Sequence, residues 1–472
     1  MSGDGAAAAA APAVDLDDVQ GLVLRGYRHM LCARHLLLRI DRRDGFRALL
    51  SELITENLES PYITTAADWE PKPLPGDHPP HCVNIGFTYS ALRPLGLPDA
   101  TRATFPIEFI EGAVARAQDV GDTGANAPEH WIAELRGDAD LHVVLSLYGR
   151  DAAALEDVAR DVRAQIVRHA AAHELRALDA HWPYERDGKA REGVVHFGYQ
   201  DGLSQPTLAG VPPTVKAGIR DPLEDVPLGE FLLGHPTQRP GLVHHGPTPP
   251  ELGHNGSFAG FRIAEQDVGA FDRYLDELSD GTEHGRELVA AQLCGRWRNG
   301  VPLVMSPDSD GPDIDRDQWN MFDFATRHPD PTGALCPVGS HVRRANPRRH
   351  PVAGGGGHKR RLIRRGMPYG PPHDRSAPDG EERGLVGMFI CASLKEQFEF
   401  VMREWIDDGG FAGLGRTRDP LTGNNDPPGE LPLGGDPPRR LTGLPRFVTT
   451  RGGAYLFLPS MTALRYLARL KT

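Results

Sequence analysis

The stretch from Cys336 to Gly370, CPVGSHVRRANPRRHPVAGGGGHKRRLIRRGMPYG, is the part of the chain around which the rest is organised. Nine Lys or Arg residues follow His341 within it, although the whole chain of 472 residues carries a net charge of -12. A local positive field of this kind favours an anionic ligand. The nine residues are Arg343, Arg344, Arg348, Arg349, Lys359, Arg360, Arg361, Arg364 and Arg365.

Three kinds of anion can be compared with this stretch. Nucleic acid is disfavoured because the basic cluster is short, lies in an acidic chain and shows no recognition-helix pattern. A phosphate loop is disfavoured because Gly354 to Gly357 lack the Walker spacing. The propionates of haem need arginines, while the iron needs one imidazole, and His341 with Arg343 and Arg344 offers both. The residues alone leave this open, since most histidines are ordinary surface or core residues.

Length and composition indicate a large soluble globular protein of two or three domains, with 39% hydrophobic residues. The apolar run at residues 6–11 has no basic region before it and is too short to span a bilayer, so neither a signal peptide nor membrane binding is expected. Five scattered cysteines without a Cys-x-x-Cys pair argue against disulfides and zinc sites. We expect a reducing cytoplasmic location. Cys336 could supply a thiolate ligand, but a small buried residue is the commoner role.

The first half of the chain is expected to form a split βαβ unit of the ferredoxin-like kind. Alternating apolar residues predict its strands, and apolar residues at helical spacing predict its helices. In chain order we expect a strand at 32–40, a helix at 44–58, a strand at 81–89, a helix at 107–117, a strand at 141–148, a helix at 151–169 and a strand at 175–182.

The second half is expected to repeat this order of elements without any detectable repeat of sequence. Its last helix is expected to be capped by Ser460. The expected elements are a strand at 257–263, helices at 268–278 and 286–297, a strand at 384–393, a helix at 394–407, a strand at 447–458 and a helix at 461–470.

These elements predict an α+β fold made of two tandem ferredoxin-like halves with antiparallel sheets. Residues 203–255 and 409–445 are rich in Pro and Gly, and we expect them to be long loops. We place a disordered tail at residues 1–14, an N-terminal domain at 15–210 and a C-terminal domain at 211–472.

Six strings, in order along the chain, resemble motifs of the dye-decolorizing (DyP-type) haem peroxidase family. The resemblance runs from about residue 15 to the C-terminus. The strings are DVQGLVLRGY from Asp18, GYQDG from Gly198, CPVGSHVRRANPR from Cys336, LIRRGMPYG from Leu362, QFEF from Gln397 and RGGAYLFLPS from Arg451.

The resemblance implies one haem b per chain, held mainly by the second half. Matched position by position, the proximal iron ligand falls on His341, and the distal aspartate and arginine fall on Asp201 and Arg364. The residues expected to contact the cofactor are His341, Arg343, Arg344, Gly202 and Leu385.

The chemistry of these residue types agrees with the implied roles. Cleavage of peroxide needs a base that takes a proton from one oxygen and returns it to the other, and the Asp201 carboxylate on a glycine-flanked turn suits this. Arg364 can stabilise the negative charge that develops on the leaving oxygen. By charge alone, Arg361 or Arg365 could compete for that role.

Two features depart from the family pattern or are left open by it. Related sequences often carry a Phe two residues after the leucine that corresponds to Leu385, whereas this chain has Gly387, so a roomier pocket is expected. A proximal histidine normally donates its second N–H to an acceptor. The motifs do not identify that acceptor, and Glu399 is a weak candidate.

The family resemblance implies a peroxidase that reduces hydrogen peroxide and oxidises phenolic, aromatic or dye-like donors by one-electron steps. A haem-binding, haem-sensing or haem-handling protein is the alternative, because one fold hosts several activities. The pairing of Asp201 with Arg364 favours the enzyme, since a carrier needs neither. A metal hydrolase that uses His244, His245 or His358 lacks any helix-spaced ligand pair.

Overall fold

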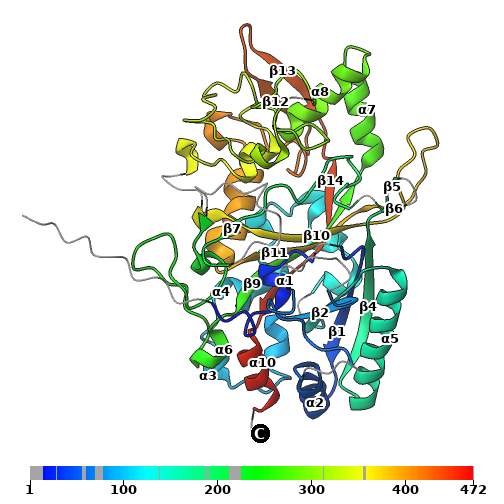
Figure 1. Ribbon diagram of the computed structural model, residues 1–472, viewed down its shortest axis with the longest axis vertical. Helices are drawn as coiled ribbons and strands as arrows, with labels where there is room; N and C mark the ends of the chain where they lie inside the picture. Colours follow the sequence, from blue (N-terminus) through cyan, green and yellow to red (C-terminus); the bar gives the residue numbers. More distant parts are fainter. Residues whose placement is uncertain are drawn as a thin grey trace, which may run out of the picture.

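A computed structural model describes residues 14–470, apart from 28, 56–59, 70–77, 138, 187–188, 191, 212–224, 312 and 354–357 (Figure 1). The predicted tail at 1–14 therefore lies almost wholly outside the described residues. So does part of the long loop that follows the predicted boundary at residue 210, and the division into domains stays a prediction.

Eight strands form one sheet in the order β10-β11-β9-β14-β2-β3-β1-β4. Numbered along the chain within each half, both sets of four strands have the order 2-3-1-4, and all pairs are antiparallel. This order is that of a ferredoxin-like unit, so the predicted fold class is confirmed. The strands are β1 (Cys32–Ile40), β2 (His81–Phe87), β3 (Val143–Gly149), β4 (Ala172–His181), β9 (Ser257–Gln266), β10 (Ile363–Tyr369), β11 (Gly384–Cys391) and β14 (Val448–Leu458).

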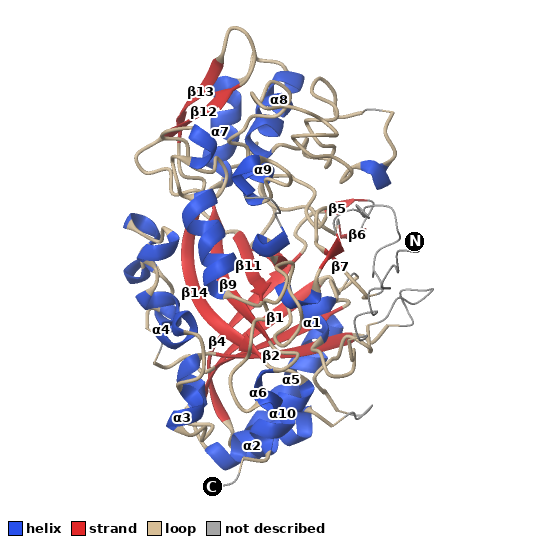
Figure 2. Cartoon of the chain, turned by 90° about the vertical axis from the view of Figure 1, so that its left-hand side faces the viewer, coloured by secondary structure: helices blue, strands red, loops and turns tan. Residues whose placement is uncertain are grey.

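Some helices pack against the sheet in the lower part of the molecule, and others lie at the upper end, above the sheet (Figures 1 and 2). The helix α5 (Ala152–His169) is an example. The Asp151 carboxylate caps it by accepting a hydrogen bond from the Ala154 N–H (2.8 Å), and its buried face, with Leu155, Val158 and Val162, packs into the core. The other helices are α1 (Gly21–Leu24), α2 (Arg43–Leu53), α3 (Asp99–Arg102), α4 (Ile107–Ala115), α6 (Pro250–Gly253), α7 (Val268–Leu278), α8 (Glu283–Cys294), α9 (His341–Ala345) and α10 (Met461–Ala468).

Several predicted elements have different limits or a different form. α8 ends at Cys294, because Gly295 takes a left-handed conformation (φ 89°) that closes the helix. The helix predicted at 394–407 exists but winds as two π-helical segments, η13 (Leu394–Glu399) and η14 (Val401–Ile406). Such wide turns are rare and occur mostly near functional sites.

One strand was not predicted, and one predicted loop contains a hairpin. β10 lies inside the basic stretch, where arginine, glycine and proline hide the strand pattern. The region 409–445 contains the hairpin of β12 (Gly429–Leu433) and β13 (Arg439–Leu444), whose inward-facing leucines are buried. Short paired segments also occur at β5 (Glu185–Arg186), β6 (Lys189–Ala190), β7 (Thr207–Leu208) and β8 (Asp225–Val226).

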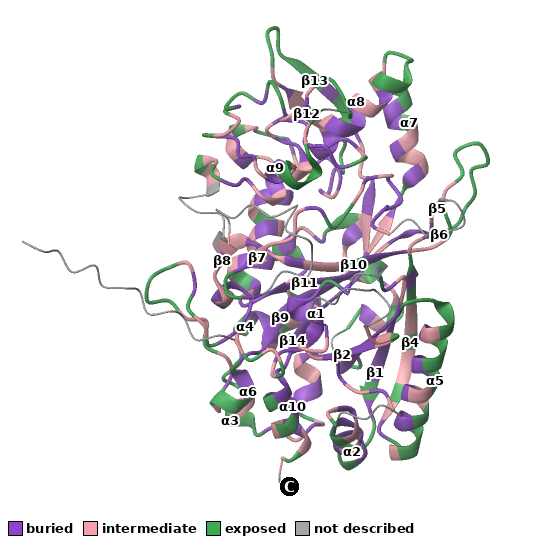
Figure 3. Cartoon of the chain, in the orientation of Figure 1, coloured by how far each residue is buried: buried purple, intermediate pink, exposed green. Residues whose placement is uncertain are grey.

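The two halves of the sheet meet at a narrow seam. β14 and β2 pair only through Phe457 and Phe87. Aromatic rings reinforce the seam, since Phe457 lies 5.4 Å from Phe105 and 5.6 Å from Phe258, measured between ring centroids. The main cluster of buried apolar residues therefore runs through both halves (Figure 3).

A second, smaller core lies at the upper end, between α7, α8 and the β12–β13 hairpin (Figure 2). α9 lies at this end of the molecule and packs against η14. No helix in the described ranges is both long and apolar enough to cross a membrane.

Candidate active site

His341 is the first residue of α9, directly after the extended residue Ser340. The turn before α9 is held by a hydrogen bond from the Cys336 N–H to the Asp330 carboxylate (2.9 Å). Cys336 is fully buried, and burial raises the pKa of its thiol to about 11. The thiol is therefore protonated near neutral pH when no metal is bound, as expected for a small buried residue.

The partner of His341 is Asp419. The Nδ1 atom of His341 lies 2.9 Å from Oδ2 of Asp419, which is fully buried. The other carboxylate oxygen accepts backbone hydrogen bonds from Leu421 and Thr422, at 2.9 Å each. Burial alone would raise the pKa of Asp419, but the charge and hydrogen bond of His341 hold it below its usual value. Asp419 is thus an ionised acceptor that orients the imidazole.

This contact decides which nitrogen of His341 can bind a metal. A carboxylate only accepts, so in the neutral imidazole Nδ1 carries the proton and Nε2 has the lone pair that can bind a metal. No hydrogen bond to Nε2 is found within the described part of the chain. A metal bound by this one imidazole would have to bring its remaining ligands with it, as haem iron does.

The weak prediction of Glu399 as this acceptor was wrong. Glu399 is buried on η13 and pairs with the guanidinium of Arg116, whose Nη2 lies 2.7 Å from Oε2. Tyr455 donates to the same carboxylate at 2.9 Å. Asp419 was missed because it lies 78 residues from His341 in a loop rich in Pro and Gly. The Asp-Pro-Leu-Thr turn, with its capping aspartate, was the available signal.

Asp201 lies on a tight loop between Gly198 (φ 84°) and Gly202 (φ 76°). Its backbone N–H donates to the Gly193 carbonyl (2.6 Å), and its carboxylate accepts from the Gly202 N–H (2.6 Å). The side chain is exposed. The two glycines take the positive φ that this turn requires, so the loop presents the carboxylate at a fixed place.

Arg364 lies on β10, and hydrogen bonds link it to the loop that carries Asp201. Its Nη2 donates to the Ser204 carbonyl (3.2 Å). The Gln205 side chain bonds the backbone N–H and carbonyl of Arg364, both at 3.1 Å. Three hydrogen bonds thus join the strand that carries Arg364 to the loop that carries Asp201.

The charges of Arg364 and Asp201 both act on the imidazole of His341. Burial lowers the pKa of His341 and Asp419 raises it, with a net result above the usual value. Arg364 lowers the same pKa further, and Asp201 raises it.

The structure does not support cofactor binding by Arg343 and Arg344. Arg343 is buried and donates to the Asp330 carboxylate (3.0 Å) and the Cys336 carbonyl (2.6 Å). Arg344 is fully buried and donates to the carbonyls of Trp405 and Thr417. Both guanidinium groups therefore fasten α9 to its surroundings, because buried arginine charge needs protein acceptors.

Gly202 and Leu385 occupy different environments. Around Gly202 the space in the Cβ direction is open to 4 Å, which would allow close approach of a flat ligand. Leu385 is half-buried and packs on the upper core, as does Val342, the neighbour of His341. Nothing in these contacts tests either residue as a haem contact, and both assignments stay predictions.

The expectation that Gly387 enlarges the pocket is not supported. A Cβ atom on Gly387 would lie 2.1 Å from the Arg365 carbonyl oxygen, on the paired strand. The backbone of β10 thus occupies the space that a side chain at this position would need. Glycine is needed there for close approach of two strands.

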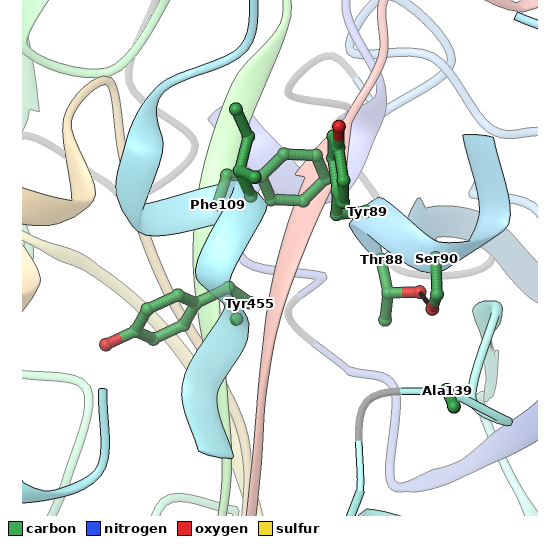
Figure 4. Close-up of a pocket in the computed structure, with 8 residues that line it drawn as sticks. Thr88, Tyr89, Ser90, Phe109, Ala139 and Tyr455 are labelled. Carbon is green, nitrogen blue, oxygen red and sulfur yellow. Dashed lines mark hydrogen bonds between the residues drawn. The ribbon is translucent and has the colours of Figure 1, made fainter. Parts of the chain in front are cut away.

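A separate cavity of about 290 Å³ lies away from the site residues (Figure 4). Tyr89, Phe109 and Tyr455 line it, with the Thr88 and Ser90 hydroxyls on one side. None of the predicted site residues lines it, and we place the chemistry at His341, which a buried carboxylate orients. Among the described residues, no group of three or more His, Cys, Asp or Glu could hold a metal ion by itself.

Comparison with known proteins gives a consistent result. Residues 18–182 match the family described as "DyP dimeric alpha+beta barrel domain". The chain is 28% identical to the dye-decolorizing peroxidase msp1 of Mycetinis scorodonius, over 98% of this chain and 89% of that protein. It is 30% identical to the multifunctional dye peroxidase DyP2 of Amycolatopsis sp., over 58% of this chain and 61% of that protein.

Solved structures agree. A dye-decolorizing peroxidase in complex with 2,6-dimethoxyphenol superposes with a TM-score of 0.79 at 26% identity, covering 96% of this chain and 100% of the other. An ancestral D-type dye-decolorizing peroxidase gives a TM-score of 0.77 at 28% identity, covering 96% of this chain and 99% of the other.

Proposed function

The chain belongs to the family of dye-decolorizing peroxidases, and from this premise we propose that it binds one haem b through Nε2 of His341 and uses Asp201 and Arg364 on peroxide. It is a haem peroxidase that reduces hydrogen peroxide and oxidises phenolic or dye-like donors. Two observations support the assignment of residues: Asp419 orients the imidazole of His341, and three hydrogen bonds join the strand of Arg364 to the loop of Asp201.

Each residue has a defined task in this proposal. Haem, when bound, would supply the redox chemistry: it would give two electrons to peroxide and regain them one at a time from the donor. Asp201 accepts a proton from one peroxide oxygen and returns it to the other, which leaves as water. Arg364 stabilises negative charge on the leaving oxygen. Asp419 raises the electron density on the His341 ring.

We also propose a cytoplasmic location. The support is that all five cysteines are free, and that four of them are buried. A chain of this size built for an oxidising compartment would more often use cysteines in disulfides.

An absorption spectrum of the haem-loaded protein, recorded before and after one equivalent of peroxide, tests the proposed function. We expect a Soret band that disappears in His341→Ala, and a wild-type spectrum that changes within seconds of peroxide addition. A spectrum that stays unchanged in peroxide would instead indicate a haem-handling protein. A wild-type spectrum retained by His341→Ala would contradict the ligand assignment.

A further inference from the structure

The loop that carries Asp201 is one end of a β-hairpin at residues 193–201. Its two arms pair through a β-bridge between Val194 and Gln200. His196 lies in the turn at the tip of the hairpin, and Asp201 lies at its base. A change in the direction of the hairpin would therefore move Asp201.

The side chain of His196 attaches the tip of the hairpin to β10. His196 is only 3% exposed, and its Nε2 lies 2.8 Å from the Tyr369 carbonyl oxygen, at the end of that strand. A carbonyl only accepts, so Nε2 carries the proton and donates it. Burial lowers the pKa of His196 to about 4, and the charge of Arg383 adds to this, so the imidazole is neutral near neutral pH.

The second ring nitrogen of His196 has no such contact. Nδ1 is buried and has no hydrogen-bond partner among the residues that the structure describes. An unpaired buried nitrogen costs free energy, and an apolar side chain of similar shape would avoid that cost. The Nε2–H donor, and not packing, therefore explains a histidine at this position.

A second attachment joins the base of the same loop to the other end of β10. The Gln205 side chain bonds the backbone N–H and carbonyl of Arg364, both at 3.1 Å. Arg364 and Tyr369 are five residues apart on β10. The attachments at the base and the tip are thus separated by about 17 Å along the strand. One attachment alone would allow the hairpin to pivot, whereas two at this separation fix its direction.

Tyr199 holds the hairpin to a different part of the molecule. Its hydroxyl donates to the Ala290 carbonyl on α8 (2.8 Å). The hairpin with Asp201 is therefore fastened to the upper core, whereas Arg364 belongs to the sheet. The hydrogen bond from His196 joins these two parts at the tip of the hairpin.

We propose that His196 is a positioning residue for the reaction with peroxide. Its hydrogen bond to Tyr369 sets the direction of the hairpin and, with it, the place of Asp201 relative to Arg364. This rests on the proposed function and adds a residue that touches none of the reacting atoms. Loss of the bond should misplace the Asp201 carboxylate, and a misplacement of about 1 Å can slow a reaction roughly 10²-fold.

Stopped-flow measurements on haem-loaded His196→Gln and His196→Asn test the role of the donor. The glutamine amide nitrogen can take the place of Nε2, whereas the shorter asparagine takes the place of Nδ1 and does not reach Tyr369. We expect the rate with peroxide to fall roughly 10- to 100-fold in His196→Asn and less than about threefold in His196→Gln. The Soret band should be unchanged in both. An equal loss of rate in the two variants would overturn the proposal.

A double-variant cycle with Asp201→Asn tests whether His196 acts through Asp201. In the Asp201→Asn background, His196→Asn should slow the reaction by less than about a further twofold, because the group that it positions is no longer a base. A residue that only stabilised the fold would cost the same factor in both backgrounds. An undiminished loss would therefore overturn the proposal.

His142→Asn is the matched control. His142 is also buried, and its Nε2 lies 3.2 Å from the Ala139 carbonyl, in the N-terminal half of the chain. We expect this variant to keep the wild-type rate with peroxide. A loss equal to that in His196→Asn would assign the effect to the removal of any buried histidine and overturn the proposal.

Amide hydrogen exchange separates this proposal from the proposed function, because it needs no peroxide. Peptides that cover residues 193–205 should exchange at least about tenfold faster in His196→Asn than in wild type or His196→Gln, while peptides from α8 keep their rate. Faster exchange would support the attachment even if the wild-type protein did not react with peroxide. Unchanged exchange in His196→Asn would overturn it, even if that variant reacted slowly.

Discussion

At the scale of single residues, the site depends on one hydrogen bond that the motifs did not identify. His341, Asp201 and Arg364 could be assigned from local strings, because each lies in a short distinctive sequence. Asp419 could not, since its role is created only when a distant loop closes on α9. Arg343 and Arg344 were misassigned, because charge density alone does not tell a ligand contact from a buried anchor.

Asp419→Asn should weaken the hydrogen bond that orients His341. The substitution leaves the size of the side chain at position 419 nearly unchanged. The neutral amide can still accept a hydrogen bond but no longer carries charge, so we expect a roughly 10- to 100-fold loss of haem affinity or of peroxide reactivity. The reduction potential of the haem iron should rise, and spectroelectrochemistry measures it.

Asp407→Asn is the control for this change. Asp407 is a nearby, partly buried carboxyl. Loss of solvation raises its pKa to about 7, and it accepts a hydrogen bond from the Asn424 N–H instead of from His341. A similar rise in potential in both variants would contradict a specific role for Asp419.

At the scale of elements, β10 links the site to the sheet, and it is the strand that the sequence did not reveal. Its Ile-Arg-Arg-Gly-Met-Pro-Tyr sequence shows no apolar alternation, and its buried residues are Ile363, Met367 and Pro368. The neighbouring strand β11 was predicted from its apolar residues. Pairing of Gly366 with Gly387 brings the two backbones close together.

Gly387→Ala should destabilise the fold by about 1 to 3 kcal/mol, because its Cβ would overlap the Arg365 carbonyl and force the strands apart. Gly366→Ala is the matched control, since the nearest atom to its Cβ would be the Val386 oxygen at 3.7 Å. Urea unfolding compares them. Equal midpoints for the two variants would contradict the close approach.

His35 on β1 should make stability depend on pH. It is buried against Ser146 (2.9 Å), and burial lowers its pKa to about 4. An unfolded histidine titrates near 6.5, so as pH falls from about 6.5 to 4 the unfolded state takes up the proton first. Up to about 3 kcal/mol of stability should be lost across this range.

The difference in unfolding free energy between wild type and His35→Gln, measured by urea titration from pH 7 to pH 4, isolates this group. It should change steadily in favour of the variant as pH falls. His173→Gln, at an exposed position on β4, is the control. A difference that stays constant over the range would show that His35 is not the source.

At the scale of the whole molecule, the two ferredoxin-like halves act as a frame that holds loops from both sides of the chain midpoint around His341. The order of elements was predictable from apolar periodicity, which is strong in long buried strands. The joining of eight strands into one sheet was not, because it depends on a single pair, Phe457 with Phe87.

Phe457→Ala should cost about 3 to 5 kcal/mol, since it removes a buried ring from the seam between the halves. Ile107→Ala, at a side chain that is 53% exposed, should cost less than about 0.5 kcal/mol. Guanidinium unfolding followed by tryptophan fluorescence provides the comparison. A loss for Phe457→Ala no larger than that for Ile107→Ala would indicate that the seam does not hold the halves together.

We propose that Asp201 and Arg364 act together on peroxide at a haem bound by His341. Stopped-flow measurement of the reaction of haem-loaded protein with peroxide tests it most directly. Asp201→Asn should slow the reaction about 10² to 10⁴-fold, and Arg364→Leu about 10² to 10³-fold. The double variant should lose less than the product of the two factors, because both groups act on one transition state. Wild-type rates in Asp201→Asn, with haem still bound, would contradict the account.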